Sequence, residues 1–195
     1  MERAEDRRII RIAGGDRHGF LQGLITNAVP SPGDGLRYAA LLTPQGKYLA
    51  DFLILAQEDA LLLDVKDALV AGLVQRLTLY KLRADVTIEQ PDMPVWRGTG
   101  PAPEGALADP RHPALGWRHY GDGAPSGAAE DWDAIRVRHC IPESGIELIP
   151  NETFVIEAGF ERLGGIDHAK GCYIGQEVMS RMKRKSTLTK GLETV

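Results

Sequence analysis

Residues 170–177 read Lys170-Gly171-Cys172-Tyr173-Ile174-Gly175-Gln176-Glu177. Two glycines flank the cysteine, so the backbone there can turn sharply or approach a ligand closely. A helix is predicted to begin near Gly175, which places Cys172 just before its N-terminus and two residues from Lys170. Both the helix dipole and the lysine would stabilise a thiolate. The stretch predicts a nucleophilic, redox-active or ligand-binding thiol at Cys172, the alternative being a small buried side chain at a tight turn.

The composition is that of an ordinary globular protein. The chain has 195 residues, of which 43% are hydrophobic and 26% charged, and its formal net charge is −4. This length allows one large domain or two small ones. Two cysteines cannot build a disulfide scaffold, which indicates a reducing compartment. No apolar run approaches the ~20 residues of a membrane helix, and the first residues lack the apolar block of a signal peptide. We therefore expect a soluble, cytoplasmic protein without a membrane partner.

The charge is unevenly distributed along the chain. Residues 170–190 hold six basic residues and one acidic residue, a local charge of +5. Such a segment on an acidic chain indicates an anionic partner, with a solvated tail as the alternative. No aromatic residues alternate with the basic run Arg181, Lys183, Arg184 and Lys185. Direct nucleic-acid binding is therefore not expected, although an RNA-binding module stays open as a further alternative.

The first 90 residues alternate between strand-like and helical patterns. Thr43-Pro44-Gln45-Gly46 separates two apolar runs and has the residues of a hairpin turn. The predicted order is β-α-β-β-β-α-β, with strands at 9–12, 36–42, 47–56, 60–64 and 84–89 and helices at 17–25 and 66–80. We therefore expect residues 1–90 to form an α+β unit with helices on a mainly antiparallel sheet.

A second α+β unit is expected over residues 91–195. Pro91 and Pro94 mark a break, residues 115–120 predict a strand, and residues 130–140 predict a helix. This helix ends before Pro142, since the residue that precedes a proline avoids the helical region. Trp132 lies at its start, where an indole can lie over a flat ligand or, as is more common, pack in the core.

Other kinds of chemistry are poorly supported. The sequence has no Cys-x-x-Cys or His-Glu-x-x-His pattern, so no permanent metal site is expected. Its two cysteines cannot supply the four thiolates of an iron–sulfur cluster within one chain. Gly14-Gly15-Asp16 follows a predicted strand but lacks the pattern of a nucleotide-binding loop, and there is no Gly-x-Ser-x-Gly elbow. Nucleotide hydrolysis and serine hydrolysis are not indicated.

The stretch at 170–177 resembles the signature of the YgfZ-type folate-binding proteins, relatives of the glycine cleavage T-protein, an aminomethyltransferase. Three further segments resemble landmarks of that family in the same order. Residues 21–27 resemble its first helix and loop, residues 41–47 its hairpin turn, and residues 79–86 its passage from helix to strand. Trp132 and Ile141-Pro142 resemble its tryptophan helix and closing proline.

The resemblance implies a GcvT/YgfZ-like arrangement of two α+β units with mainly antiparallel sheets around a central hole. Family members continue into a C-terminal β-barrel, which we expect to be absent or truncated because 18 residues follow Glu177. The implied cofactor is tetrahydrofolate or a related folate. The implied functional residues are Cys172 and Lys170, and the implied folate-binding residues are Trp132, Gln22, Thr26, Asn27, Tyr173, Gln176 and Glu177.

The implied function is that of an accessory factor for iron–sulfur cluster assembly or repair, rather than a classical enzyme. Its partners would be iron–sulfur enzymes or the assembly machinery, and it would indirectly support tRNA thio-modification. The alternative is a tetrahydrofolate-dependent aminomethyltransferase, for which Asp51 and Asp64 are candidate acids by residue type only. The chain departs from the family at Arg138, where some members carry a glutamate that recognises the pterin.

Overall fold

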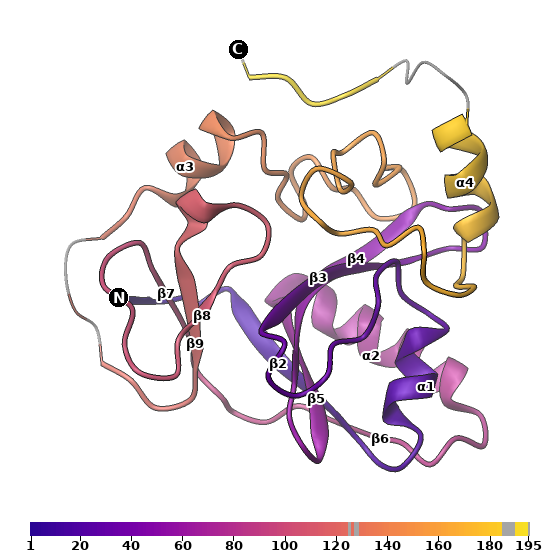
Figure 1. The fold of residues 1–195 in the computed structure, drawn as a ribbon, viewed down its shortest axis with the longest axis horizontal. Coiled ribbons are helices and arrows are strands. Elements are labelled where there is room, and N and C mark those ends of the chain that lie inside the picture. Colours follow the sequence, from indigo (N-terminus) through magenta and orange to yellow (C-terminus); the bar gives the residue numbers. More distant parts are fainter. Residues whose placement is uncertain (125, 127–128, 185–189, 195) are drawn as a thin grey trace.

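The computed structural model describes residues 1–124, 126, 129–184 and 190–194. These residues form two sheets with helices and irregular segments packed on them (Figure 1). Within this part of the chain, every strand pair of both sheets is antiparallel. The expected α+β class with mainly antiparallel sheets is therefore confirmed.

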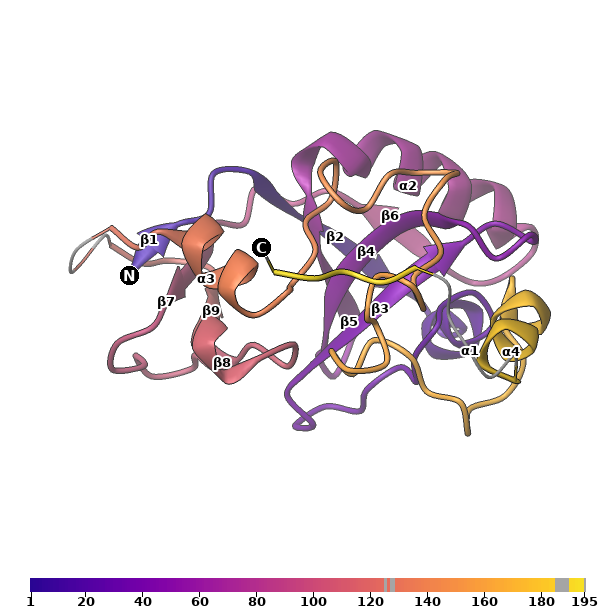
Figure 2. The same cartoon turned by 90° about the horizontal axis from the view of Figure 1, so that it is seen from above.

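The larger sheet has the strand order β3-β4-β5-β2-β6. Its strands are β2 (Arg7–Ala13), β3 (Leu36–Leu42), β4 (Tyr48–Ala56), β5 (Ala60–Lys66) and β6 (Thr87–Glu89). The helices α1 (Arg17–Gln22) and α2 (Asp67–Lys81) pack on one of its faces (Figure 2). In chain order these elements are β2-α1-β3-β4-β5-α2-β6, so the predicted order is confirmed.

Both faces of the larger sheet are buried. Along β3, Ala39 and Leu41 pack with α1 and α2, whereas Tyr38, Ala40 and Leu42 pack against residues from the second half of the chain. That second cover is largely irregular, and its buried side chains include Ile141, Leu148, Val155, Phe160 and Met179. Burial on both faces explains why these strands read as nearly continuous apolar runs.

The smaller sheet has the order β1-β7-β9-β8. Its strands are β1 (Glu2–Arg3), β7 (Val95–Gly98), β8 (Leu107–Ala108) and β9 (Trp117–Tyr120), and a 3-10 turn, Pro113–Leu115, precedes β9. The helices α3 (Trp132–Arg138) and α4 (Gln176–Arg184) follow later in the chain. Because β1 joins the smaller sheet and β2 the larger one, the first residues connect the two sheets. The division of the chain at residue 90 stays a prediction.

Several elements are shorter than predicted. The helix predicted at 17–25 ends at Gln22, with Gly23 as its C-cap, and the carbonyls of Gln22 and Ile25 accept from Lys170. The helix predicted at 130–140 begins after Asp131, whose side chain caps it, and ends before Cys140, which has a φ of +51°. None of the helices in the described ranges is long and apolar enough to cross a bilayer.

Candidate functional site

The 170–177 stretch packs against the hairpin turn between β3 and β4. Gly175 has a φ of +84° and Gly46, in the turn, a φ of +78°. A Cβ on Gly175 would lie 2.7 Å from the carbonyl oxygen of Thr43, and one on Gly46 would lie 2.9 Å from the Cβ of Val178. Helix α4 begins one residue after Gly175. The two glycines therefore let the turn and the start of α4 approach within backbone contact.

Lys170 connects the same stretch to the end of α1. Its Nζ donates to the carbonyl oxygens of Gln22 at 2.7 Å, Ile25 at 2.6 Å and Asn27 at 3.0 Å. These bonds use all three donors of an ammonium group, so none is left for a neighbouring thiolate. Burial lowers the pKa of Lys170 to about 8, with a partial opposing effect from the Asp167 carboxylate. The lysine thus stabilises the loop after α1.

The predicted folate-binding residues of this loop also bond to the main chain. Thr26 Oγ1 donates to a carbonyl oxygen at 2.6 Å, and Asn27 Nδ2 donates to two carbonyl oxygens at 2.6 and 2.8 Å. Gln22 Oε1 accepts from the N–H of Val29 at 2.8 Å. Thr26 and Asn27 are buried. All three side chains are thus bonded within the protein, Thr26 and Asn27 in its interior and Gln22 at its half-buried edge.

Cys172 is exposed, whereas Tyr173 beside it is buried. Tyr173 belongs to the second cover of the larger sheet, and burial raises the pKa of its hydroxyl to about 12. Gln176 is half-buried and Glu177 exposed at the first turn of α4. This arrangement presents a thiol at the surface on a rigidly supported loop, just before a helix.

The basic segment at residues 170–190 includes side chains that are buried or paired with an acid, and these are not available to an anionic partner. Lys170 is buried, and Lys183 pairs with Glu161 at 3.0 Å. Lys185 lies outside the described residues. The basic side chains exposed on α4 are Arg181, Lys183 and Arg184. An anionic partner for this segment stays a prediction.

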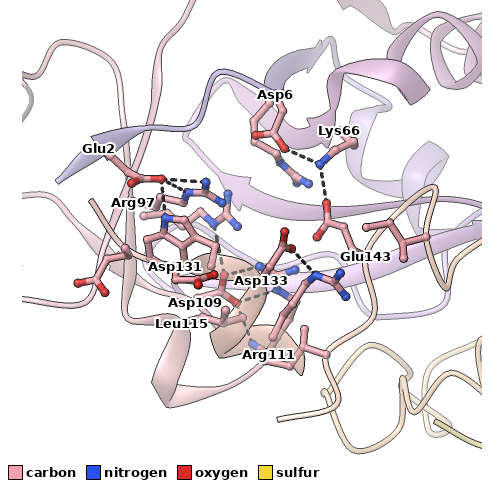
Figure 3. Close-up of a pocket in the computed structure, with 17 residues that line it drawn as sticks. Glu2, Asp6, Lys66, Arg97, Asp109, Arg111, Leu115, Asp131, Asp133 and Glu143 are labelled. Carbon is pink, nitrogen blue, oxygen red and sulfur yellow. Dashed lines mark hydrogen bonds and ion pairs between the residues drawn. The ribbon is translucent and has the colours of Figure 1, made fainter. Parts of the chain in front are cut away.

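A second candidate site is a polar cavity of about 570 Å³ lined by both sheets, by α3 and by the segment after α3 (Figure 3). Most of its lining side chains are charged. The cations are Arg7, Lys66, Arg97, Arg111, Arg118 and Arg136, and the carboxylates are Glu2, Asp6, Asp109, Glu130, Asp131, Asp133 and Glu143. Its volume is within the range of about 300–1,000 Å³ that is typical of small-molecule sites.

Trp132 belongs to this cavity. Its Nε1 donates to Glu2 Oε1 at 2.5 Å, and the Arg97 guanidinium lies 4.4 Å from its ring centroid. Arg97 also pairs with Glu2 at 2.9 Å, so the three side chains hold one another. Helix α4 lies at one end of the molecule, and α3 lies well apart from it, beside the smaller sheet, in both views (Figures 1 and 2). The structure therefore does not bring Trp132 together with Cys172.

A buried ion network lies against the cavity. Asp64 accepts from Arg7 Nε at 2.6 Å and from Arg118 Nη1 at 3.1 Å, while Asp109 accepts from Arg111 Nη2 at 2.7 Å and from Arg118 Nε at 3.3 Å. The five residues are each 1–9% exposed. Burial by itself would raise the pKa of Asp64 and of Asp109, but the adjacent guanidinium groups outweigh it and hold both below the ordinary value.

Asp51 is a further buried carboxylate. It accepts from the hydroxyls of Ser144 at 2.6 Å, Tyr48 at 2.7 Å and Tyr38 at 3.0 Å. Neither Asp51 nor Asp64 is among the residues that line the cavity in the described part of the chain. A ligand in the cavity would therefore not meet either candidate acid of an aminomethyltransferase directly.

Arg138 lies outside the cavity. Its side chain is exposed, whereas Asp133 and Arg136 of the same helix line the cavity. The arginine at this position, where some family members carry a glutamate, is therefore not part of the cavity lining.

Sequence reasoning missed the ion network and most of the cavity. Arg7, Asp109, Arg111 and Arg118 come from three separate segments, and nothing in their local sequence marks them. Asp64 did carry a signal, since it is a carboxylate within an otherwise apolar strand.

Comparison with known proteins identifies relatives by sequence. No family model matches the chain. The chain is 30% identical to "Iron-sulfur cluster assembly factor IBA57, mitochondrial" of Homo sapiens, an alignment that covers 97% of this chain and 64% of that protein. It is 28% identical to the Mus musculus protein of the same name, with the same coverage, and 25% identical to the Mycosarcoma maydis homolog, with 97% and 55% covered. The chain thus spans less than two thirds of the length of these relatives.

The names of these relatives agree with the predicted link to iron–sulfur cluster assembly, whereas the assignment to the GcvT/YgfZ-like superfamily and, within it, to the YgfZ-type proteins stays a prediction. The predicted cytoplasmic localisation is wrong by this comparison, because the three relatives are named as mitochondrial proteins. The crystal structure of glycine cleavage system aminomethyltransferase T from Bartonella henselae aligns with a TM-score of 0.43 and 13% identity. That alignment covers 48% of this chain and 26% of the other.

Proposed function

We propose that this protein is an accessory factor for iron–sulfur cluster assembly or repair, acting through the thiol of Cys172. The observation that carries the proposal is the similarity, over 97% of the chain, to a protein named as an iron–sulfur cluster assembly factor. The relatives' own partners are not known from their names, so the partners proposed here are iron–sulfur enzymes or the assembly machinery in general. Support of tRNA thio-modification would follow indirectly if one client enzyme acts in that process.

The chemistry of Cys172 supports this role. Thiolates are the ligands that iron–sulfur clusters prefer, and an exposed thiol can reach a second protein. Cys172 is exposed, whereas Cys140 is half-buried with its Sγ 2.8 Å from Thr194 Oγ1. A single exposed cysteine can hold a cluster only with ligands from another molecule. This requirement suits a factor that acts on other proteins rather than one that keeps a cluster.

The polar cavity supports a folate as the cofactor. Carboxylates such as Asp131 and Asp133 can accept hydrogen bonds from the amino-pyrimidine face of a pterin, and Trp132 provides an aromatic edge. The arginines of the cavity can pair with the carboxylates of the folate tail. When bound, a tetrahydrofolate would supply one-carbon or reducing chemistry. The residues present therefore fit the group. The narrower assignment to the YgfZ-type folate-binding proteins rests on the resemblance of residues 170–177 to their signature, and this fit supports it.

Two experiments test these proposals separately. The first is expression of the chain in cells that lack their own relative, followed by an aconitase assay as a measure of iron–sulfur enzymes. Rescue is expected, and its absence in cells that accumulate the folded chain would contradict the accessory role. A glycine cleavage assay on the purified chain is expected to show no turnover, because Asp51 and Asp64 do not line the cavity.

The second experiment is a titration with tetrahydrofolate, followed by tryptophan fluorescence. Saturable quenching is expected, and Trp132→Phe should remove most of the signal. Arg138→Glu serves as the matched control on α3, because Arg138 is exposed and outside the cavity lining. Its affinity should equal that of the wild-type chain. A large gain in affinity would show that Arg138 does contact the ligand.

A further inference from the structure

We infer that the cavity contains an oxyanion site formed by Arg7, Arg111 and Arg118, which holds a carboxylate or phosphate group of a small molecule. These three residues are called the arginine trio below. All three line the cavity, and each is between 5% and 9% exposed. The inference goes beyond the proposed function, because it specifies the chemistry of a ligand group whether or not that ligand is a folate.

Each arginine of the trio has one terminal nitrogen that the ion network does not use. Arg7 uses Nε and Nη2 on Asp64, Arg111 uses Nε and Nη2 on Asp109, and Arg118 uses Nε and Nη1 on these two carboxylates. Nη1 of Arg7, Nη1 of Arg111 and Nη2 of Arg118 have no hydrogen-bond partner among the described residues. None of the three is a fully enclosed atom. Each therefore keeps donor surface, and the cavity is the space that all three residues line together, although Arg7 also lines a second pocket formed with residues 90–95.

The other acidic residues around the cavity bond to groups outside the trio. Figure 3 shows the Lys66 ammonium between the carboxylates of Asp6 and Glu143. Glu2 pairs with Arg97 at 2.9 Å. The remaining carboxylates have partners too: Asp133 pairs with Arg136, Asp131 caps α3, and Glu130 accepts from Thr99. None of these acids is bonded to the trio.

The trio carries more positive charge than the carboxylates bonded to it. Three guanidinium groups contact two carboxylates, Asp64 and Asp109, which leaves an excess of one positive charge. Asp51 and Asp6 also act electrostatically on members of the trio, but Asp51 is held by three hydroxyl groups and does not line the cavity, and Asp6 is paired with Lys66. The network itself therefore has an unbalanced cation beside the cavity. Charge-assisted bonds from guanidinium groups to oxyanions are among the stronger hydrogen bonds in proteins.

The test is isothermal titration calorimetry of the full chain at constant ionic strength, set with chloride. Two probes distinguish the possible sources of the oxyanion: inorganic phosphate and p-aminobenzoyl-glutamate, which carries carboxylates only. Saturable binding of either probe is expected, and the tighter of the two identifies the source. Arg118→Lys keeps a charge for Asp64 and Asp109 but removes the free nitrogen, and it should weaken binding by about tenfold or more.

Arg138→Gln is the control, because it also removes one arginine charge but Arg138 is exposed and outside the cavity lining. It should change affinity by less than about twofold. Binding of neither probe, or an equal loss in Arg118→Lys and Arg138→Gln, would overturn the inference. If Arg118→Lys does not fold, the test uses the unaltered chain: millimolar phosphate should raise its melting temperature in a saturable manner above that in chloride of equal ionic strength, whereas the general effect of phosphate as a salt does not saturate. Equal melting temperatures would overturn the inference.

The outcomes for this site and for the folate proposal can be separated. Phosphate binding without any tetrahydrofolate binding would remove the folate proposal and leave the oxyanion site. Tetrahydrofolate binding that is equal in the wild-type chain and in Arg118→Lys, with no binding of either small probe, would leave the folate proposal and remove the oxyanion site.

Discussion

Arg7 holds Asp64 at two points: its Nε donates to the carboxylate at 2.6 Å, and its Nη2 donates to the main-chain oxygen at 2.5 Å. The two residues lie on neighbouring strands but are not opposite each other, because Ile9 is the register partner of Asp64. Their contact is therefore a diagonal cross-strand pair. The Arg7–Asp64 pair therefore links strands β2 and β5 of the larger sheet to the ion network beside the cavity.

Asp64→Asn should destabilise the protein strongly. The substitution leaves Arg7 and Arg118 buried with one counter-ion fewer, which typically costs about 3–5 kcal/mol. Urea unfolding measures the loss in the free energy of unfolding. The control is Asp133→Asn, which removes a pair whose carboxylate is 78% exposed and should cost less than about 1 kcal/mol. Equal losses in the two variants would contradict the role given to the network.

Acid should destabilise the protein through the same carboxylates. The pKa values of Asp64 and Asp109 are lower in the folded state than the ordinary value of about 3.9, so the unfolded state binds protons first as the pH falls. Their contribution is complete above about pH 5 and is lost progressively below it. Urea unfolding between pH 7 and pH 3 should show this decline. Asp109→Asn should have a shallower decline, and an unchanged slope would count against the assignment.

Gly175→Ala should disturb the stretch that carries Cys172, the proposed functional thiol. The added Cβ would lie 2.7 Å from the carbonyl oxygen of Thr43, at a φ of +84°, and we expect a loss of about 2 kcal/mol or more. Gly171→Ala is a control within the same stretch, because no atom lies within 4 Å of its added Cβ. Its unfolding free energy should stay close to that of the wild-type chain. Thermal unfolding of the two variants side by side makes the comparison.

Lys170→Met should reveal whether the lysine serves the fold or the thiol. It removes the donor of three carbonyl groups, so a loss of about 2 kcal/mol or more in stability is expected. The alkylation rate of Cys172 by iodoacetamide, measured in a Cys140→Ser background, should stay unchanged. A stable variant with a slower alkylation rate would instead support the predicted effect of Lys170 on the thiolate.

The parts of this protein that sequence could predict are those set by local patterns. Apolar spacing predicted α2, and the turn residues before Lys47 predicted the hairpin, because both depend on neighbours within a few positions. The bonds of Lys170 to the end of α1 span more than 140 positions, and the contact of Asp64 with Arg118 spans 54. No periodicity encodes such pairings. The exposed thiol could be located from its glycines, whereas the cavity depends on how two sheets meet.

The most direct test of the account is the rescue of aconitase activity by Cys172→Ser, in cells that lack their own relative. Cys140→Ser is the matched control, since it removes the other thiol of the chain. Both variants should accumulate as folded protein, because Cys172 is exposed and Cys140 is half-buried. The account predicts full rescue by Cys140→Ser and none by Cys172→Ser. Equal rescue by the two variants would contradict it.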